Sequence, residues 1–537
     1  MTAQQTSVLI SGAGPCGLAL AVELGSRGID CAIVEQNDRV GYAPRAKTTH
    51  TRTREHLRRW GIAGDLAAAA PFGVDYPSNV FFVTRLSGYR LAMIEDAFNC
   101  APARNELYSE HAQWVPQYRL EEVLRSRAAS LPSVRILFNH EFVSAEQTEQ
   151  GLRCQVRDLA GGGEVEFDCR YLVGADGARS LVREQIGAVM EGVFGLAHSY
   201  NIVFRAPGLA NLHPHGPGIM YWQINAEVPG LIGPMDKDDL WYFMPARVPD
   251  IVRLDKAAAA DLIRRSTGID LPYEVLSADE WTASRLIADR YREGNAFLIG
   301  DACHLHPPLG GYGMNMGVSD AVDLGWKLAA VVQGWGGAGL LDSYEQERRP
   351  VHQRVIDEAV ANLSTLALHL VRPALEADTE EGASLRAQLG ESLAQQRRRE
   401  FRSLGVVLGY RYDDSPITAH EPAPAESPPS GVYEPSARPG GLAPHAWMAD
   451  GRSLYDAFGP DFTLLDFGEG STDLEQAATD ARSLDIPLAV VRIDEPRVAA
   501  LYERRLALIR PDQHVAWRGD AWPGPAILKV ASGRASP

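Results

Sequence analysis

Cysteine is scarce in this chain, and its spacing excludes a disulfide scaffold. The 537 residues include six cysteines, at positions 16, 31, 100, 154, 169 and 303, and no Cys-x-x-Cys pair. Dense or closely paired cysteines are typical of small secreted domains, zinc sites and dithiol enzymes. Isolated thiols suit a reducing compartment, so we expect a cytoplasmic protein.

The chain also lacks a long apolar run and an excess of positive charge. No segment has the ~18 uninterrupted apolar residues that a membrane span needs. The apolar N-terminal stretch has no basic segment before it and is interrupted by a glycine turn and Glu23, unlike a signal peptide. With 52 Lys and Arg against 69 Asp and Glu, the net charge of −17 argues against a nucleic-acid partner.

The most informative motifs in the sequence are three glycine-containing turns, each of which follows an apolar strand. In the first, the strand Ser7–Ile10 leads into Gly-x-Gly-x-x-Gly, a helix and a second strand that ends in an acidic residue. This is the dinucleotide fingerprint in its required context: the glycines allow the tight turn, phosphate approach and helix packing. It predicts these cofactor-binding residues: Gly12, Ala13, Gly14, Pro15, Gly17, Glu35 and Gln36. The same pattern at Gly334–Gly339 follows a helix, so we interpret it as a loop.

The second turn follows the strand Ala296–Ile299 and extends to Gly317. Its glycines permit close backbone approach, and the next helix would direct free N–H groups at a phosphate or a negatively charged ring. The candidate cofactor-binding residues are Asp301, Pro308, Gly311, Gly313, Met314 and Asn315. His304 and His306 have no further ligands apparent in sequence, so we expect no metal site.

The third turn, Asp176-Gly177, ends the apolar strand Tyr171–Gly174. Taken alone, it is typical of a strand-to-helix turn with an aspartate cap. Three such turns in this order, with shorter motifs at Pro44–Ala46, Gln117–Glu121 and Leu341–Pro350, are far more specific. Together they resemble the aromatic-hydroxylase branch of the FAD-dependent monooxygenases, which have the p-hydroxybenzoate hydroxylase fold. The resemblance extends from about residue 7 to residue 352.

This resemblance implies a cofactor arrangement and a reaction. Arg45 and Gln117 would contact FAD, Asp176 would serve FAD and the passing nicotinamide cofactor, and the loop ending at Asn315 would cradle the isoalloxazine. NADH or NADPH would reduce FAD, and O2 would add at flavin C4a to give a hydroperoxide that hydroxylates an electron-rich aromatic ring. Alternatives are the same chemistry on a non-phenolic substrate, by Baeyer–Villiger reaction or epoxidation, and a flavin-binding protein without turnover.

The expected fold class is α/β, with three parts. Residues 1–184 and 285–412 would form a Rossmann-like FAD-binding domain with a helical extension, and 185–284 an inserted antiparallel β-sheet domain for the substrate. The segment 413–447 is a proline-rich linker. Residues 448–537 resemble the thioredoxin-like tail of phenol and polyketide hydroxylases, without Cys-x-x-Cys, and suggest a structural role in a homodimer.

Candidates for substrate chemistry are few. Tyr221, Trp222 and Phe243, in the aromatic-rich strands, are the expected pocket residues, although most aromatics there should be core. Arg45 could steer the isoalloxazine or meet an anionic substrate. Lys47 could stabilise a phenolate or act as a base, and His50 could act through water; alternatively both lie on a solvent-facing turn. The substrate could be an apolar phenol, a monocyclic acid or a polyketide-like polycycle. The basic run 397–399 is typical of a solvated helix face.

Overall fold

The computed structural model describes residues 3–38, 46–246, 254–364, 371–422, 431–468 and 472–535. Pro44 and Arg45 lie outside the described residues, so the proposed roles of Arg45 stay predictions. Within the described part, no helix is both long and apolar enough to cross a membrane.

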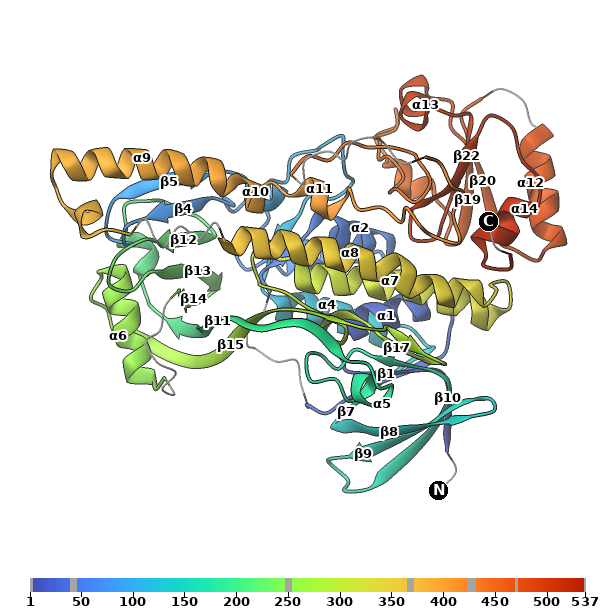
Figure 1. Cartoon of the computed structure of the whole chain (residues 1–537), viewed down its shortest axis with the longest axis horizontal. Helices are drawn as coiled ribbons and strands as arrows, with labels where there is room; N and C mark the ends of the chain where they lie inside the picture. Colours follow the sequence, from blue (N-terminus) through green and yellow to red (C-terminus); the bar gives the residue numbers. More distant parts are fainter. Residues whose placement is uncertain are drawn as a thin grey trace.

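The first sheet is the expected Rossmann-like unit (Figure 1). Its central strands lie in the order β16-β17-β10-β1-β2-β7, and β1 runs parallel to both β2 and β10. Three consecutive β1 residues, Val8, Leu9 and Ile10, are fully buried, as expected for a parallel strand covered on both faces. The strand bounds are β1 Gln4–Ser11, β2 Cys31–Glu35, β7 Val134–Phe138, β8 His140–Thr148, β9 Gly151–Asp158, β10 Glu164–Gly174, β16 Arg292–Glu293 and β17 Ala296–Leu298.

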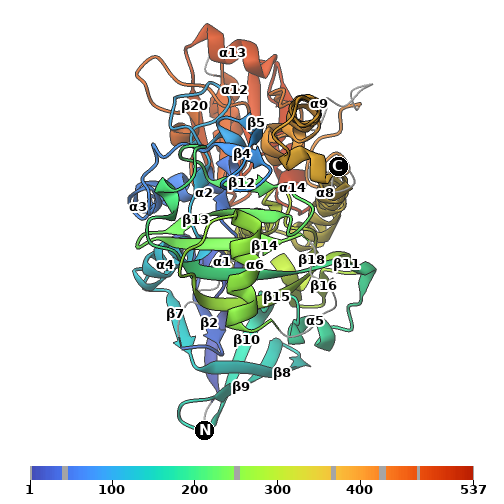
Figure 2. The same ribbon diagram turned by 90° about the vertical axis from the view of Figure 1, so that its left-hand side faces the viewer.

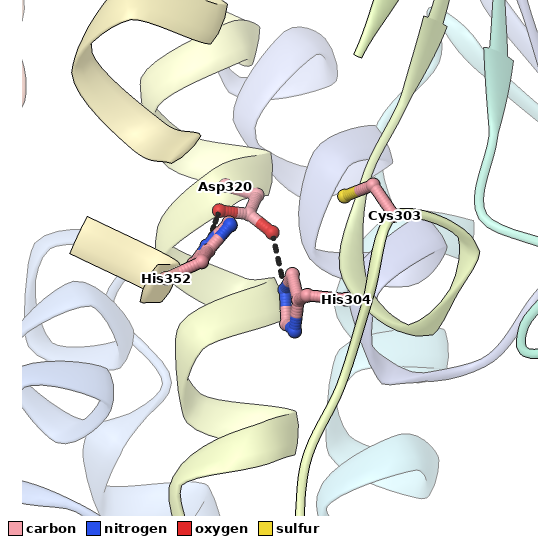
Figure 3. Close-up of side chains that lie close together, drawn as sticks. All are labelled: Cys303, His304, Asp320 and His352. Atoms are coloured by element: carbon pink, nitrogen blue, oxygen red, sulfur yellow. Dashed lines mark hydrogen bonds and ion pairs between the residues drawn. The ribbon is translucent and has the colours of Figure 1, made fainter. Parts of the chain in front are cut away.

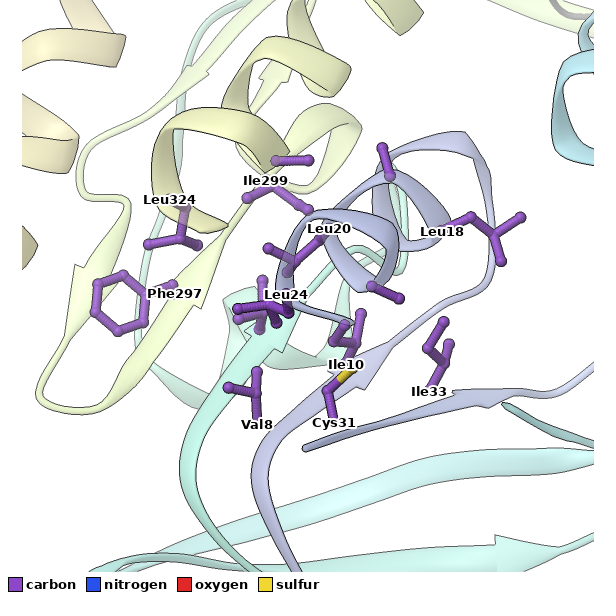
Figure 4. Packing of buried hydrophobic residues seen from close by; sticks show 14 of the residues in the cluster. Val8, Ile10, Leu18, Leu20, Leu24, Cys31, Ile33, Phe297, Ile299 and Leu324 are labelled. Carbon is purple, nitrogen blue, oxygen red and sulfur yellow. The ribbon is translucent and has the colours of Figure 1, made fainter. Parts of the chain in front are cut away.

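Long helices cover this sheet and form its core. In Figure 4, Leu20 and Leu24 of α1 pack close to Ile10 of β1, and Phe297 of β17 meets Leu324 of α7. This interleaving removes the apolar stripe of each helix from water and supplies the main stabilising free energy of the unit. The helices here are α1 Pro15–Ser26, α4 Gln117–Ala129, α5 Leu181–Gln185, α7 Tyr312–Gln333 and α8 Gly339–Ser364.

The second sheet is the expected inserted antiparallel sheet, but it is larger than the sequence suggested. Its order is β18-β15-β11-β14-β13-β12-β4-β5, and α6 lies across its outer face (Figure 2). Strands β4 and β5 precede the expected segment by about a hundred residues, and β4 pairs in parallel with β12. The bounds are β4 Val80–Val83, β5 Arg90–Ile94, β11 Met190–Arg205, β12 Met220–Gln223, β13 Gly230–Asp236, β14 Leu240–Pro245, α6 Lys256–Thr267, β15 Glu274–Ala288 and β18 His304–Leu305.

Short elements connect the two sheets around the carboxyl edge of the first. A two-stranded ribbon, β3 with β6, leads into α2, and α9 packs against β5. The bounds are β3 Thr48–Thr49, α2 Thr51–Arg59, α3 Ala63–Ala68, β6 Gln113–Trp114, α9 Glu380–Gln396, α10 Arg398–Phe401 and α11 Leu404–Val407, with 3-10 turns η1 Ala97–Asn99, η2 Leu209–Asn211, η3 Gly300–Ala302, η5 Pro373–Glu376 and η6 Leu454–Ala457.

The C-terminal part has a thioredoxin-like α/β arrangement. Its sheet order is β20-β19-β21-β22, with β19 parallel to β20 and antiparallel to β21. Phe462 of β19 packs edge-on against Trp326 of α7, so this sheet shares a hydrophobic cluster with the helices that cover the first sheet. The expected domain boundaries stay predictions. The bounds are β19 Phe462–Asp466, α12 Thr472–Ser483, β20 Leu488–Arg492, α13 Pro496–Tyr502, β21 Leu506–Ile509, β22 Val515–Gly519 and α14 Ala526–Ala531.

A buried ionic cluster joins the same two parts. Arg510 lies 2.9 Å or less from both Glu347 of α8 and Asp512, and 3.1 Å from Asp323 of α7. Lys327 pairs with Asp323 at 2.7 Å and with Glu347 at 2.5 Å, and all five side chains are at most 3% exposed. Each charge has a partner, which a buried charge requires.

The cluster predicts a large effect for Arg510→Met. The substitution leaves the carboxylates of Glu347 and Asp512 buried with less compensation, so we expect a loss of ~3–5 kcal/mol in the free energy of unfolding. Chemical denaturation followed by fluorescence measures it. The matched control is Arg504→Met, whose pair with Asp520 is more than half exposed. A loss within about 0.5 kcal/mol of that control would contradict a stabilising role for the cluster.

Glu23 of α1 predicts a pH dependence of stability. Burial alone would raise the pKa of this carboxyl, but Arg59 and Arg27 lower it from 4.5 to about 2. Since the folded-state pKa is depressed, the stabilisation is complete above about pH 5 and is lost as the pH falls toward 2. Glu23→Gln should cost ~2–3 kcal/mol near pH 7, and this cost should shrink below pH 4.5 in acid unfolding curves.

The control for Glu23 is Glu141→Gln. Glu141 pairs with Arg157 at the surface, where both side chains are 30% or more exposed. We expect its substitution to change stability by less than ~0.5 kcal/mol at either pH. A Glu23→Gln cost that does not vary with pH would contradict the ionic explanation.

Candidate active site

The three predicted turns meet at one edge of the first sheet. β1, β10 and β17 are neighbours in the sheet, and their carboxyl ends carry Gly12, Asp176 and Asp301 respectively. Because parallel strands end at the same edge, turns far apart in sequence lie together, where open α/β sheets bind ligands. A cavity of about 390 Å3 opens at this edge, and all three turns contribute to its lining.

The first turn has the geometry of a phosphate-binding loop. A Cβ at Gly12 would lie 2.4 Å from the carbonyl oxygen of Ala175, and one at Gly17 would lie 2.0 Å from that of Gly12. Both positions therefore require glycine for packing. Gly14 instead faces open space, with no atom within 4 Å of a built Cβ, so a ligand can approach the backbone. Gly14 also begins α1 without a side-chain cap, which leaves N–H groups free for an anion.

The neighbouring predicted residues lie beside this loop. Pro15 lines the cavity, whereas Ala13 donates its backbone N–H to the Glu35 carboxylate at 2.9 Å. Glu35 also accepts from the backbone N–H and the side chain of Asn37, and Gln36 next to it is exposed. Asp176 accepts from the Val182 N–H through Oδ2, while its buried Oδ1 has no partner among the described residues. The Oδ1 of Asp176 and the open N–H groups at the start of α1 fit the ribose hydroxyls and phosphates of a dinucleotide.

The start of α7 forms another wall of the cavity. Gly311 begins this helix with φ of 68°, in the left-handed region, and no side-chain cap covers the first turn. From this helix start and the turn before it, the residues that line the cavity are Asp301, Pro308, Gly311, Gly313 and Met314. The positive end of the α7 dipole therefore faces the cavity, which suits negative charge on a flavin ring.

Asn315 has a different position from the one expected. Its Oδ1 accepts from the His50 N–H at 2.8 Å and from Thr53, and its Nδ2 donates to the carbonyls of Thr48 and Gly311. The side chain is 2% exposed and does not line the cavity. Asn315 thus secures the segment that carries the candidate substrate residues against α7. Gln117 does line the cavity, and its Oε1 accepts from the Ala46 N–H at 3.2 Å.

Lys47 and His50 are both enclosed, so neither lies on a solvent-facing turn. The Lys47 ammonium lies 4.1 Å from the centre of the Tyr242 ring and faces the cavity without an ion pair to any described residue. Burial lowers its pKa from 10.5 to about 8. His50 is 2% exposed, its Nε2 lies 2.8 Å from the Gly310 carbonyl oxygen, and burial lowers its pKa to about 4. Since His50 does not line the cavity, Lys47 is the better placed of the two.

The substrate wall requires a correction to the expected pocket residues. Trp222 lines the cavity, but Tyr221 and Phe243 do not. Both pack in the core beneath α6, where the Tyr221 ring stacks on Phe81 at 5.3 Å. Alternate residues of a strand point to opposite faces of the sheet, so the neighbours of Tyr221 and Phe243 in sequence line the cavity instead. The residues of the sheet that line the cavity are Ala197, His198, Ser199, Met220, Trp222, Leu231, Tyr242, Met244, Pro245 and Trp281.

Several lining residues had no signal in the sequence. Phe98, Trp114, Leu363 and Glu400 reach the cavity from elements outside the recognised motifs. Arg397, beside Glu400, is 1% exposed, so the interpretation of the run 397–399 as a solvated face is wrong for Arg397, whereas Arg398 and Arg399 are exposed. The Arg397 guanidinium instead lies 4.9 Å from the centre of the Trp222 ring.

A polar cluster behind the flavin turn gathers Cys303, His304, Asp320 and His352 (Figure 3). Their ligand atoms lie within 4.8 Å of one another, a spacing that a metal ion can use. However, Nε of Arg348 lies 2.8 Å from Asp320 Oδ1, so a positive charge already faces this carboxylate. The Asp320 carboxylate also accepts hydrogen bonds from the imidazoles of His304 and His352 and from the Gly300 N–H. We interpret the cluster as a hydrogen-bonded anchor for the turn at Gly300; sequence spacing alone did not reveal it.

Comparison with known proteins identifies the family to which this chain belongs. The family model for the FAD binding domain matches residues 5–359, and that for the aromatic-ring hydroxylase C-terminal region matches 436–534. The 2,4-dichlorophenol 6-monooxygenase of Delftia acidovorans is 32% identical over 97% of this chain and 96% of its own. The aklavinone 12-hydroxylase DnrF of Streptomyces peucetius is 33% identical over 88% of this chain and 93% of its own.

Solved structures agree with these matches. The rebeccamycin biosynthetic enzyme RebC with reduced flavin has a TM-score of 0.91 and 34% identity, and the alignment covers 100% of both chains. The flavin-dependent monooxygenase PieE, in complex with FAD and substrate, has a TM-score of 0.90 and 29% identity over 99% of each chain. With both family models matched and the fold shared along its whole length, the chain belongs to the FAD-dependent aromatic-ring hydroxylases.

Proposed function

We propose that this protein is a single-component monooxygenase that uses FAD and NADH or NADPH to hydroxylate a phenolic substrate. The observation that carries the proposal is that one cavity combines two kinds of lining. Gly14 and Gly311 supply open backbone for a cofactor, and Trp222 and Lys47 supply an aromatic ring and an ammonium group for a substrate. The names of the relatives, which include a dichlorophenol monooxygenase and an aklavinone hydroxylase, support the substrate class.

The cofactor and the protein would divide the work. Bound FAD would supply the redox chemistry, taking electrons from NAD(P)H and activating O2 for transfer of one oxygen atom to the ring. Gly14 and the start of α1 would hold the pyrophosphate, and the start of α7 would stabilise negative charge on the flavin ring. The apolar side chains of the wall would exclude water from the reacting atoms.

Lys47 would increase the reactivity of the substrate. A nearby cation favours the ionised form of a phenol, and a phenolate ring is a stronger nucleophile than a phenol ring. The pKa of about 8 leaves Lys47 mostly protonated at neutral pH, as this role requires. The alternative role as a base would require the neutral amine, which dominates only above that pKa. The two roles therefore predict opposite trends with pH.

The function is tested by rapid mixing of the oxidised holoenzyme with NADH or NADPH and a panel of phenols. We expect particular phenols to accelerate the loss of flavin absorbance, and one atom of 18O2 to enter the product. The methyl ethers of the same phenols are the control. A single slow rate of flavin reduction, whatever aromatic compound is added, would favour the non-catalytic flavin-binding protein; an ester or epoxide product would favour the other monooxygenase reactions.

Lys47→Met predicts a loss of turnover with a changed pH profile. Removing the ammonium group should reduce kcat/KM ~10–100-fold at pH 7, the effect of losing one charge-assisted contact. In the wild type, the advantage over Lys47→Met should decline as the pH rises through about 8, because Lys47 loses its proton there. Lys47→Arg retains the charge and should lose less. An advantage that grows above pH 8 would instead support the neutral amine as a base.

A further inference from the structure

A buried charged pair, Arg397 and Glu400, lies between the aromatic wall and the glycine turn that begins α7. Both side chains are at most 3% exposed and form an ion pair where α9 passes into α10. Glu400 lines the cavity and Arg397 does not; the Arg397 guanidinium lies 4.9 Å from the centre of the Trp222 ring and donates to the Asn362 carbonyl oxygen at 3.1 Å.

Glu400 is held in place by its neighbours. Its Oε1 accepts from the N–H of Gly310, in the glycine turn that begins α7, at 3.3 Å. The Gly310 carbonyl oxygen is in turn bound by His50 at 2.8 Å. The carboxylate is therefore fixed between Arg397 and the flavin turn, facing the space that a substrate would share with the flavin ring. Fixed acceptors of this kind discriminate between ligands because they need no rearrangement on binding.

The remaining acceptor capacity of Glu400 points to a ligand. An ionised carboxylate has about four lone-pair directions, and Gly310 and Arg397 account for two contacts. The other described carboxylate that lines the cavity, Asp301, belongs to the predicted cofactor turn. Lys47 lines the same cavity and makes no ion pair with Glu400 or any other described residue, so the two charges remain separate.

We propose that Glu400 accepts a hydrogen bond from a hydroxyl group of the aromatic substrate and thereby selects phenols over their ethers. The inference rests on the proposed function and extends it by naming the group that orients the ring. A ligand without a donor would leave this buried carboxylate facing an apolar ring, which costs affinity. Glu400 would position the neutral hydroxyl on binding, while Lys47 would stabilise negative charge as it develops on the ring during the reaction.

The test is equilibrium binding to the oxidised holoenzyme, without NAD(P)H. The probes are 2-naphthol and 2-methoxynaphthalene, titrated while the flavin absorbance spectrum is recorded. We expect the wild type to bind the naphthol ~10-fold more tightly than the ether, and Glu400→Gln to lose most of that preference while its affinity for the ether changes by less than ~2-fold. The FAD content of each variant is measured first, since Glu400 also contacts the glycine turn.

The matched control is Glu358→Gln. Glu358 of α8 does not line the cavity. It pairs with Arg399, which is close to Arg397 in sequence, and the Arg399 side chain is 49% exposed. This variant should retain the wild-type preference. Equal weakening of both probes in Glu400→Gln would show that Glu400 only secures the turn at Gly310, and would overturn the proposal. Equal affinities of the wild type for the two probes would overturn it without any variant.

The two proposals can fail separately. A wild type that prefers the naphthol but shows no phenol-dependent flavin reduction would retain the role of Glu400 in binding and contradict the monooxygenase. A wild type that turns over phenols and ethers alike, and binds them alike, would retain the monooxygenase and contradict the role of Glu400.

Discussion

The buried carboxylate of Asp320 is the constraint on which the rest of the site depends. It is fully buried in α7, and it accepts from Arg348 and His352 of α8, from His304 of β18 and from the backbone of Gly300. Removing any one donor would leave the others to compensate a charge in a low-dielectric interior. This one group therefore fixes the turn after β17 against both long helices, and with it the geometry of the cradle.

The C-terminal sheet belongs to the same arrangement, although it lies far from the cavity along the chain. Arg52, at the start of α2, donates to the Asp512 carbonyl oxygen at 2.6 Å and to the Gln513 side chain at 2.7 Å. The segment immediately before Arg52 carries Lys47 and the residues that Asn315 secures. In Figure 1 the C-terminal part lies beside one end of α7. The tail thus contributes to the active site by holding α2 in position, without dithiol chemistry.

Local sequence patterns predicted much of the fold, because the strand, turn and helix of each cofactor motif are set by adjacent residues. Prediction failed where a partner lies far away in sequence. The pairing of β4 with β12 joins segments about 140 residues apart, and Glu400 reaches the cavity from beyond all recognised motifs. Tyr221 and Phe243 were chosen in the correct strands but on the wrong face, since alternation gives the period of a strand and not which face meets the ligand.

That alternation has a consequence for how the selectivity of this cavity can be changed. On β12 and β14, every second side chain supports the core under α6, and those between them face the ligand. Met220 and Met244 line the cavity but also pack against buried clusters, so mutations there can change which compounds are accepted and also cost some packing free energy. New specificities become accessible by single steps, each compatible with an intact flavin cradle. β12 and β14, which flank β13, thus each combine a face that packs under α6 with a face that lines the cavity.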